Sequence, residues 1–228
     1  MGIQLDSVVP WGRCLEEYTR MFALTEADRQ RQILDCGAGP ASFTAEMTQL
    51  GHSVIACDPI YEFGVAAIAN RIQATYENII TQLQQHLNSY VWRDITSPEH
   101  LGKVRMAAMQ QFLLDFSAGK AAGRYRVASV LQLPFEDNYF DLALSSHFLL
   151  MYATQLGEPF HIQAIQELCR VAREVRIFPL LTVSGEPSPW LTVVQATAAQ
   201  LGYGSEILEV PYEFQKGGNQ MLIFRISS

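Results

Sequence analysis

The chain has 228 residues, of which 49% are hydrophobic and 17% charged, so it can bury a sizeable core and should not be disordered. Its formal net charge of −7 argues against a broad surface for binding nucleic acid. The four cysteines are scattered without a C-x-x-C pair, which predicts buried thiols in a reducing compartment and no metal site. The sequence also has no stretch typical of a signal peptide and no apolar run long enough to cross a bilayer. We therefore expect one cytoplasmic α/β domain over residues 1–228, without a membrane partner.

Residues 1–30 are expected to form an N-terminal helical segment ahead of the first strand. Residues 1–12 look irregular, and residues 14–22 then place apolar side chains on one face of a helix. This segment contains aromatic and basic side chains that could contact a ligand.

The first predicted strand ends at Ile33-Leu34 and leads into a bend that contains two glycines. Gly37 and Gly39 stand two residues apart, and residues 41–50 have the character of a helix. A strand, a glycine turn and a helix form the binding corner of nucleotide-binding folds, because glycine lets the backbone turn sharply and lets a ligand approach. The dinucleotide fingerprint needs a third glycine where Ser42 stands.

A second short apolar strand, residues 53–57, ends in Asp58. An acid at the end of the second strand is placed to accept hydrogen bonds from the hydroxyls of a ribose. The sequence contains no G-x-x-x-x-G-K-[ST] pattern, which argues against a phosphate-binding P-loop.

Residues 64–120 are longer than one crossover helix requires and are expected to form a helical insertion. Residues 64–90 carry apolar side chains every three or four positions, which predicts a long amphipathic helix. Ser97-Pro98 starts a second helix, which continues over residues 101–116 with a broad apolar face. We hypothesise that this insertion covers the substrate pocket.

The third strand is predicted over residues 125–130 and the fourth over residues 142–145. A ligand of an open parallel sheet lies beyond the carboxyl ends of its strands, so the residues after the fourth strand should face the reacting group. These are Ser146, His147 and Phe148. His147 is a candidate general base, because histidine titrates near neutral pH; a histidine hydrogen-bonded to the backbone is the alternative.

The remaining chain predicts a helix over residues 158–171, a strand over 174–178 and a helix over 190–201. Two further strands, residues 207–214 and 221–226, are expected to form a hairpin through a turn at residues 216–219.

Taken together, these features resemble the class I S-adenosylmethionine-dependent methyltransferases. Asp35 stands two residues before Gly37, as the acid does in their first motif, D/E-x-G-x-G-x-G. Residues 133–141, LPFEDNYFD, are similar to their L-P-F-x-D-x-x-F-D segment, and a C-terminal antiparallel hairpin is characteristic of their fold. The chain departs from the pattern at Ala41, in place of the third glycine, and at Ser129, where an acid often binds the adenine amino group.

The resemblance implies an α/β Rossmann-like fold with a mostly parallel seven-stranded sheet and S-adenosyl-L-methionine as the cofactor. The cofactor contacts that follow from it are Asp35, Cys36, Gly37, Ala38, Gly39, Asp58, Pro59, Ile60, Ser129, Val130 and Ser145. Candidates for a lid or for substrate contacts are Trp11, Arg13, Tyr18, Arg20, Tyr61, Ser146 and Phe148.

The function expected from the resemblance is methyl transfer to a small-molecule acceptor, at oxygen or nitrogen rather than at carbon. A nucleic-acid acceptor is disfavoured by the acidic balance and by the absence of an Asn/Asp-Pro-Pro-Tyr/Phe sequence after the fourth strand. Ala41 and Ser129 leave open a non-catalytic protein that binds S-adenosylmethionine. A nicotinamide-dependent oxidoreductase is a further alternative, which Ser42 and the terminal hairpin disfavour. The identity of the acceptor leaves no mark in the sequence, and either a monomer or a homodimer is expected.

Overall fold

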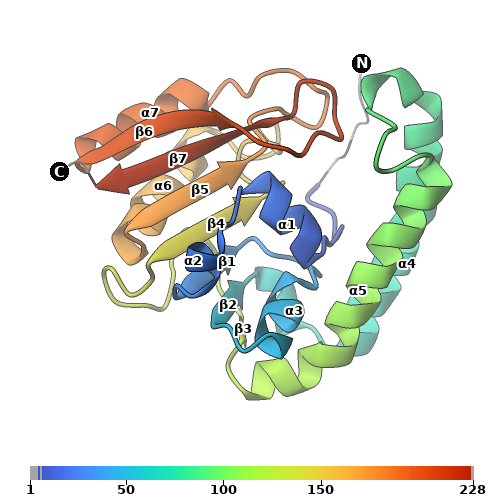
Figure 1. Ribbon diagram of the computed structural model, residues 1–228, viewed down its shortest axis with the longest axis horizontal. Helices are drawn as coiled ribbons and strands as arrows, with labels where there is room; N and C mark the ends of the chain where they lie inside the picture. The colour runs from blue at the N-terminus through green and yellow to red at the C-terminus, as the bar shows by residue number, and fades with distance from the viewer. Residues whose placement is uncertain (1–4, 6, 227–228) are drawn as a thin grey trace.

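Seven strands form one sheet within the described part of the chain, residue 5 and residues 7–226 of a computed structural model (Figure 1). They are β1 (Ile33–Cys36), β2 (Val54–Cys57), β3 (Tyr125–Arg126), β4 (Leu142–Ser146), β5 (Glu174–Phe178), β6 (Tyr203–Glu209) and β7 (Gln220–Ile226). Their order across the sheet is β3-β2-β1-β4-β5-β7-β6. Only β7 runs antiparallel to its neighbours, β5 and β6. The predicted mostly parallel sheet with an antiparallel C-terminal hairpin is therefore confirmed.

The helices connect these strands and cover both faces of the sheet. They are α1 (Leu15–Met21), α2 (Glu26–Arg29), α3 (Phe43–Gln49), α4 (Val65–Gln85), α5 (Pro98–Ala121), α6 (Glu158–Val171) and α7 (Leu191–Gln200), with two short 3-10 helices, η1 (Pro59–Glu62) and η2 (Leu87–Ser89). None of the described helices combines the length and the apolar character that spanning a membrane requires.

Alternation along the central strands creates two cores, because successive side chains of a strand point to opposite faces. Leu34 of β1 packs in one cluster with residues of α6 and α7, whereas Ile33 packs in another with residues of α1 and α3. Ala143 and Leu142 of β4 divide in the same way between the two clusters. Figure 1 shows α1 in front of the sheet and α6 and α7 behind it.

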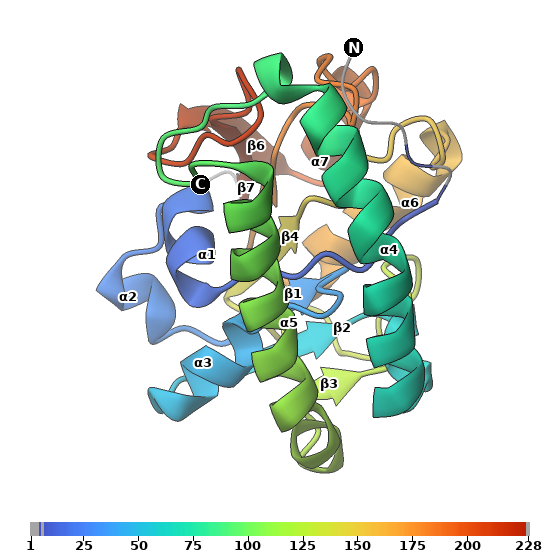
Figure 2. The same cartoon turned by 90° about the vertical axis from the view of Figure 1, so that its right-hand side faces the viewer.

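The helical insertion lies across the carboxyl ends of the parallel strands. In Figure 1 the arrowheads of β4 and β5 point toward the pair of α4 and α5, and in Figure 2 this pair crosses in front of the strands. The buried face of α4 has the predicted spacing of three and four, through Ile68, Ile72, Thr75, Ile79 and Leu83. The insertion therefore covers the end of the sheet at which parallel α/β folds bind their ligands.

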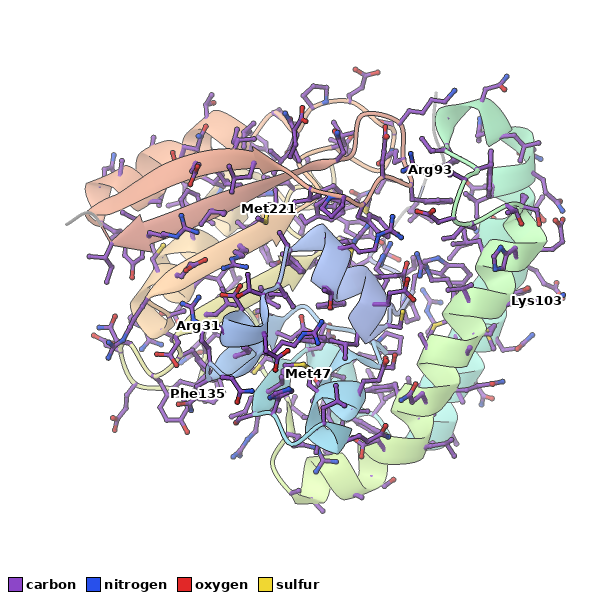
Figure 3. All side chains as sticks on the ribbon, viewed as in Figure 1. Arg31, Met47, Arg93, Lys103, Phe135 and Met221 are labelled. Atoms are coloured by element: carbon purple, nitrogen blue, oxygen red, sulfur yellow. The ribbon has the colours of Figure 1, made fainter. Side chains whose placement is uncertain are left out.

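The start of the second insertion helix, α5, follows from local chemistry. The Ser97 side chain accepts a hydrogen bond from the backbone of His100, and Pro98 occupies the first turn of α5, as its missing N–H allows. On α5, Lys103 is exposed and points outward, whereas Arg105 is only 1% exposed (Figure 3). The prediction that the first helix reaches residue 90 is wrong, because α4 ends at Gln85 and is followed by η2.

Two predicted strands have different bounds in the structure. The third strand is β3, of two residues, instead of residues 125–130, because its neighbour β2 ends at Cys57 and offers no partner beyond Arg126. The predicted strand over 207–214 is also wrong, because β6 begins at Tyr203 and ends at Glu209. Residues 210–219 form the whole connection to β7, and their backbone bonds instead to residues 89–91, for example from Val91 N to Phe214 O at 2.7 Å.

Candidate functional site

The glycine bend lies at the carboxyl end of β1, beside the end of β2. Gly37 and Gly39 have φ angles of +69° and +54°, which are in the left-handed region that favours glycine. The Gly37 N–H donates to Cys57 O at 2.9 Å, which ties the bend to β2. A Cβ on Gly37 would lie 2.5 Å from Cδ1 of Phe148, so this position also excludes a larger residue for lack of space.

Asp58 holds the bend from the neighbouring strand. Its Oδ2 accepts a hydrogen bond from Gly39 N at 2.9 Å, and its Oδ1 accepts one from Ile60 N at 2.8 Å. Burial raises the pKa of Asp58, and the two N–H donors oppose this rise. The second acid of the predicted site therefore meets the bend directly, while a part of it remains exposed.

Of two cavities in this part of the molecule, the one that opens above the bend is called the larger cavity. It measures about 710 Å³, which lies in the range of pockets for cofactors and other small ligands. Most of the predicted cofactor contacts line it: Gly37, Ala38, Gly39, Asp58, Pro59, Ile60, Ser129 and Val130. The wall is completed by Val8, Val9, Pro10, Trp11, Pro40, Glu62, Phe63, Ala67, Ile68, Arg71, Ala128, His147, Phe148, Leu156 and Phe160.

Asp35 lies beneath the bend and outside the lining of the larger cavity. Its side chain is fully buried, and burial raises the pKa of Asp35 to about 8. Its Oδ1 accepts a hydrogen bond from the hydroxyl of Tyr18 at 3.2 Å, and its Oδ2 has no hydrogen-bond partner among the described residues. The first acid of the motif therefore carries its polar atoms in the protein interior.

Other predicted residues line neither the larger cavity nor a second cavity that lies beside it. Cys36 is buried in the core of the sheet, and Ser145 and Ser146 are buried on β4. Tyr61 is fully buried, and its hydroxyl donates to Gly39 O at 2.7 Å, so it braces the bend from below. Arg20 forms an ion pair of 2.5 Å with Asp94, and it also lines neither cavity.

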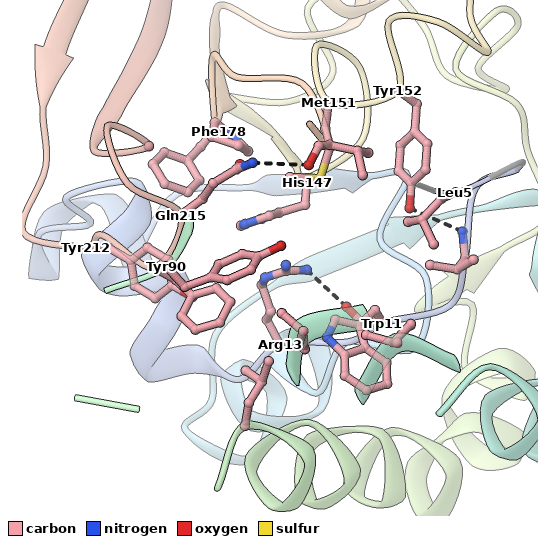
Figure 4. A pocket seen from close by; sticks show the side chains of 18 residues that line it. Leu5, Trp11, Arg13, Tyr90, His147, Met151, Tyr152, Phe178, Tyr212 and Gln215 are labelled. Atoms are coloured by element: carbon pink, nitrogen blue, oxygen red, sulfur yellow. Dashed lines mark hydrogen bonds between the residues drawn. The ribbon is translucent and has the colours of Figure 1, made fainter. Parts of the chain in front are cut away.

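A second cavity, which we call the smaller cavity, lies between the N-terminal segment, the insertion and the connection 210–219 (Figure 4). It measures about 90 Å³. Its lining is mainly apolar and aromatic, and it consists of Leu5, Val9, Trp11, Arg13, Ile79, Leu83, Tyr90, Leu101, His147, Met151, Tyr152, Phe178, Pro179, Val183, Tyr212, Phe214, Gln215 and Gly218. Val9, Trp11 and His147 line both cavities, so they form the wall that the two cavities share.

His147 is held in an unusual backbone conformation at this shared wall. Its φ is +51°, and its N–H donates to Phe178 O at 2.6 Å. Its Nδ1 lies 3.0 Å from Oγ of Ser146, and Figure 4 shows its ring pointing into the smaller cavity. Burial lowers the pKa of His147 well below its ordinary value, and the positive charges of Arg13 and Arg105 lower it further. The imidazole is therefore uncharged at neutral pH and is a weaker base than an ordinary histidine, so it does not titrate near neutral pH as the sequence alone suggested.

A buried charged cluster, which the sequence did not predict, lies beside the smaller cavity. Arg105 of α5 forms an ion pair with Glu17 of α1, and Glu17 Oε1 also accepts a hydrogen bond from the Tyr212 hydroxyl at 3.0 Å. A signal for Arg105 was present, because it stands four residues after Leu101 and seven before Phe112, on the apolar face of the helix. Glu17 and Tyr212 carried no comparable local signal.

Comparison with known proteins supports the resemblance seen in the sequence. Residues 78–175 match the family model of a methyltransferase domain. The chain is 32% identical over 224 residues to the Uncharacterized protein MJ0045 of Methanocaldococcus jannaschii, with 98% of each chain covered.

Solved structures with a similar course of the chain include a TehB-like SAM-dependent methyltransferase from Corynebacterium glutamicum, with a TM-score of 0.49, 16% identity, and 92% of this chain and 87% of that chain covered. The PH0226 protein from Pyrococcus horikoshii OT3 has a TM-score of 0.49 at 12% identity, with 93% of this chain and 89% of that chain covered. With the sheet order, the family-model match and the full-length relative considered together, the chain belongs to one family with the MJ0045 protein, among the class I S-adenosylmethionine-dependent methyltransferases.

Proposed function

We propose that this methyltransferase modifies an oxygen or a nitrogen of a small-molecule acceptor, with the methyl donor in the larger cavity and the acceptor in the smaller one. The observation that carries the proposal is the position of His147, which lines both cavities. A side chain at a shared wall can contact the reacting atoms of two ligands that approach from opposite sides.

The residues of the larger cavity fit the donor, S-adenosylmethionine. The volume of about 710 Å³ exceeds what one nucleoside needs and leaves room for the amino-acid part of the molecule. In the proposed arrangement, Gly37 and Gly39 let the donor approach the backbone, and the carboxylate of Asp58 accepts the ribose hydroxyls. A Cβ added to Gly39 would meet no atom within 4 Å, so the bend leaves open space on this side.

The protein's tasks in this reaction are alignment, exclusion of water and removal of one proton. When bound, S-adenosylmethionine supplies a methyl group that the sulfonium charge already activates. The acceptor's oxygen or nitrogen forms the new bond to carbon as the carbon–sulfur bond breaks, and the sulfur keeps the electron pair. His147, uncharged at neutral pH, takes the proton that the acceptor loses.

A small acceptor is favoured over a macromolecule by the cover over the site. The smaller cavity is closed in by three separate segments: residues around Val9 and Trp11, the helices α4 and α5, and the connection 210–219. The N-terminal segment is tied down by a hydrogen bond of 3.3 Å from Val9 N to the Tyr152 hydroxyl. A nucleic acid or a protein side chain on a large partner would have to displace this cover, and the net charge of −7 repels nucleic acid.

The experiment uses S-adenosylmethionine with a tritiated methyl group and an extract of the native organism, separated by ultrafiltration after the reaction. We expect tritium to enter the low-molecular-weight fraction, in products that carry the methyl group on oxygen or nitrogen. Label found only in protein or nucleic acid would overturn the proposal, as would a product methylated at carbon. A variant with His147→Asn is the matched control, and it should transfer much less label while it binds S-adenosylhomocysteine normally.

A further inference from the structure

We propose that the acceptor is a small apolar carboxylic acid, held in the smaller cavity by pairing of its carboxylate with Arg13. The inference rests on the proposed function, because it assigns an acceptor to the cavity next to the donor site. It assigns the carboxylate to the anchoring end of the molecule and the methylated oxygen or nitrogen to the end near His147.

The guanidinium of Arg13 forms no ion pair with any carboxylate of the described residues. Among residue 5 and residues 7–226, no carboxylate forms an ion pair with Arg13, although its guanidinium lines the smaller cavity. Its Nη1 donates to the backbone oxygen of Trp11 at 3.0 Å, and its Nε is buried without a partner. Arg13 is partly exposed, so its charge is only partly hydrated, and an anion in the cavity would pair with this charge and with the buried Nε–H.

Glu17, the carboxylate whose charge acts on Arg13, is already bound to other groups. Glu17 forms the ion pair with Arg105, accepts the hydroxyl of Tyr212 and accepts the backbone N–H of Cys14. Two guanidinium groups, Arg13 and Arg105, thus share the neighbourhood of one carboxylate, and the cluster carries one excess positive charge. Burial lowers the pKa of Arg13, and the nearby charge of Arg105 lowers it further.

Gln215 gives an independent indication that the smaller cavity is built for a polar ligand. The residue is 9% exposed, and its Nε2 donates to the backbone oxygens of Thr182 and Val183 at 3.2 and 3.1 Å. Its Oε1 is buried without a hydrogen-bond partner among the described residues. A ligand that offers an O–H or N–H would satisfy this oxygen, and a buried acceptor without a hydrogen bond is unfavourable.

The rest of the lining selects an apolar body. The polar groups are surrounded by Ile79 and Leu83 from α4, Leu101 from α5, Phe178 from β5 and Phe214 from the connection 210–219. A dry cavity of about 150 Å³ holds one benzene ring, so about 90 Å³ accommodates a branched aliphatic chain or part of a ring that extends toward the larger cavity. In Figure 4 the guanidinium of Arg13 and the ring of His147 both point into this space.

A second source of a carboxylate must be distinguished from the acceptor, because the donor itself is an amino acid. Arg13 lines the smaller cavity and is not part of the lining of the larger one, where the glycine bend and Asp58 lie. This placement assigns Arg13 to the acceptor. If instead the donor's carboxylate reached Arg13, S-adenosylhomocysteine and a simple acid would compete for it.

The test measures binding to the full-length chain by ligand-observed NMR and by the side-chain Nε–H resonance of Arg13. The probes are isovalerate and benzoate, each compared with its uncharged amide, isovaleramide and benzamide, in the presence and absence of saturating S-adenosylhomocysteine. We expect each acid to bind at least about tenfold more tightly than its amide, to shift the Arg13 resonance, and to bind with S-adenosylhomocysteine present.

Arg13→Gln should abolish the preference for acids and keep the affinity for S-adenosylhomocysteine, which also shows that the variant is folded. The matched control is Arg225→Gln, which removes an arginine of β7 that pairs with Glu206 outside both cavities and should behave as the wild type. Gln215→Leu supplies a second variant. It should weaken the binding of salicylate, which carries a hydroxyl, more than the binding of benzoate.

Equal binding of acid and amide, no saturable binding of either acid, or a preference that survives in Arg13→Gln would overturn the inference. Displacement of the acids by S-adenosylhomocysteine would assign Arg13 to the donor and overturn it as well. Failure of S-adenosylhomocysteine to bind the wild-type chain would count against the proposed function instead.

Discussion

The hydroxyl of Tyr18 donates a hydrogen bond to Asp35 across 3.2 Å, and both side chains are almost completely buried under the glycine bend. Burial raises the pKa of Asp35 to about 8; the hydrogen bond from Tyr18 opposes this rise, and the charge of Asp58 adds to it. A carboxyl group of the motif therefore holds a proton in the folded protein at neutral pH, unlike the same group in the unfolded chain.

This relationship predicts a specific pH dependence of stability. The folded pKa lies above the ordinary value, so the contribution of Asp35 to the free energy of unfolding is complete below about pH 4 and is lost as the pH rises to about 8. The loss amounts to at most roughly 1.4 kcal/mol per pH unit. Asp35→Asn keeps an acceptor for Tyr18 and cannot titrate, so its free energy of unfolding should fall less than that of the wild type over this range.

Urea denaturation across the same range measures the effect. Asp137→Asn removes an exposed carboxylate and serves as the control, whose curve should follow the wild type. Parallel curves for the wild type and Asp35→Asn would show that the carboxyl group of Asp35 titrates normally.

Replacement of Asp58 should weaken donor binding. Asp58→Ala removes the acceptor proposed for the ribose hydroxyls, and the expected dissociation constant for S-adenosylhomocysteine rises by roughly ten- to a hundredfold in calorimetry. The change also removes the side-chain acceptor for Gly39 N and Ile60 N. Asp58→Asn keeps one oxygen for these N–H groups and isolates the effect of the charge. Its affinity for S-adenosylhomocysteine should therefore lie between the affinities of the wild type and of Asp58→Ala. Wild-type affinity in Asp58→Ala would exclude a contact with the ribose.

Replacement of His147 should separate chemistry from donor binding. Asparagine tolerates the φ of +51° better than most residues, so His147→Asn preserves the local backbone. We expect the rate of methyl transfer to fall by roughly a hundredfold or more, with the dissociation constant of S-adenosylhomocysteine almost unchanged. The pKa of His147 lies well below its ordinary value, so the wild-type rate should be constant around neutral pH and should fall only at clearly acidic pH. A variant with the wild-type rate would remove His147 from the mechanism.

Gly37 and Gly51, which both have a φ in the left-handed region, offer a matched pair of substitutions. Alanine at Gly51, with φ +84° and no atom within 4 Å of an added Cβ, should cost about 1–2 kcal/mol through backbone strain alone. Alanine at Gly37 should cost more, because its Cβ would also collide with Phe148. Thermal unfolding measures both variants. Adding Phe148→Leu should recover part of the loss in Gly37→Ala and none in Gly51→Ala, and equal costs at the two glycines would contradict the collision.

Local patterns predicted those parts of the molecule that local chemistry determines. The bend at Gly37 and Gly39, the acid at Asp58 and the buried face of α4 follow from short-range rules of turns and helices. The structure brings Gly37, Gly39 and Asp58 together. The bounds of β5 and α6 also agree with the prediction, since Pro179 follows the strand and Pro159 lies in the first turn of the helix.

The smaller cavity could not be predicted in this way, because its residues come from segments distributed along almost the whole chain. Gln215 shows the difficulty: it lies in a stretch that alternates like a strand, yet the backbone there bonds to residues 89–91. Which side of the chain faces a cavity then depends on a partner far away in the sequence. Asp35 shows the opposite case, in which a motif residue was found, but its burial beneath the bend was not.

The cluster of Glu17, Arg105 and Tyr212 has a consequence for engineering. These residues belong to the first helix, the insertion and the C-terminal connection, and they meet at one buried ion pair. A chimaera that receives α4 and α5 from a relative without the matching partners would have an unpaired charge in its interior. This charge would lower the free energy of unfolding by about 3–5 kcal/mol. An exchange of the insertion therefore needs residues that match Glu17 and Tyr212 in the two other segments, and mutational libraries built in the insertion should keep Arg105 unchanged.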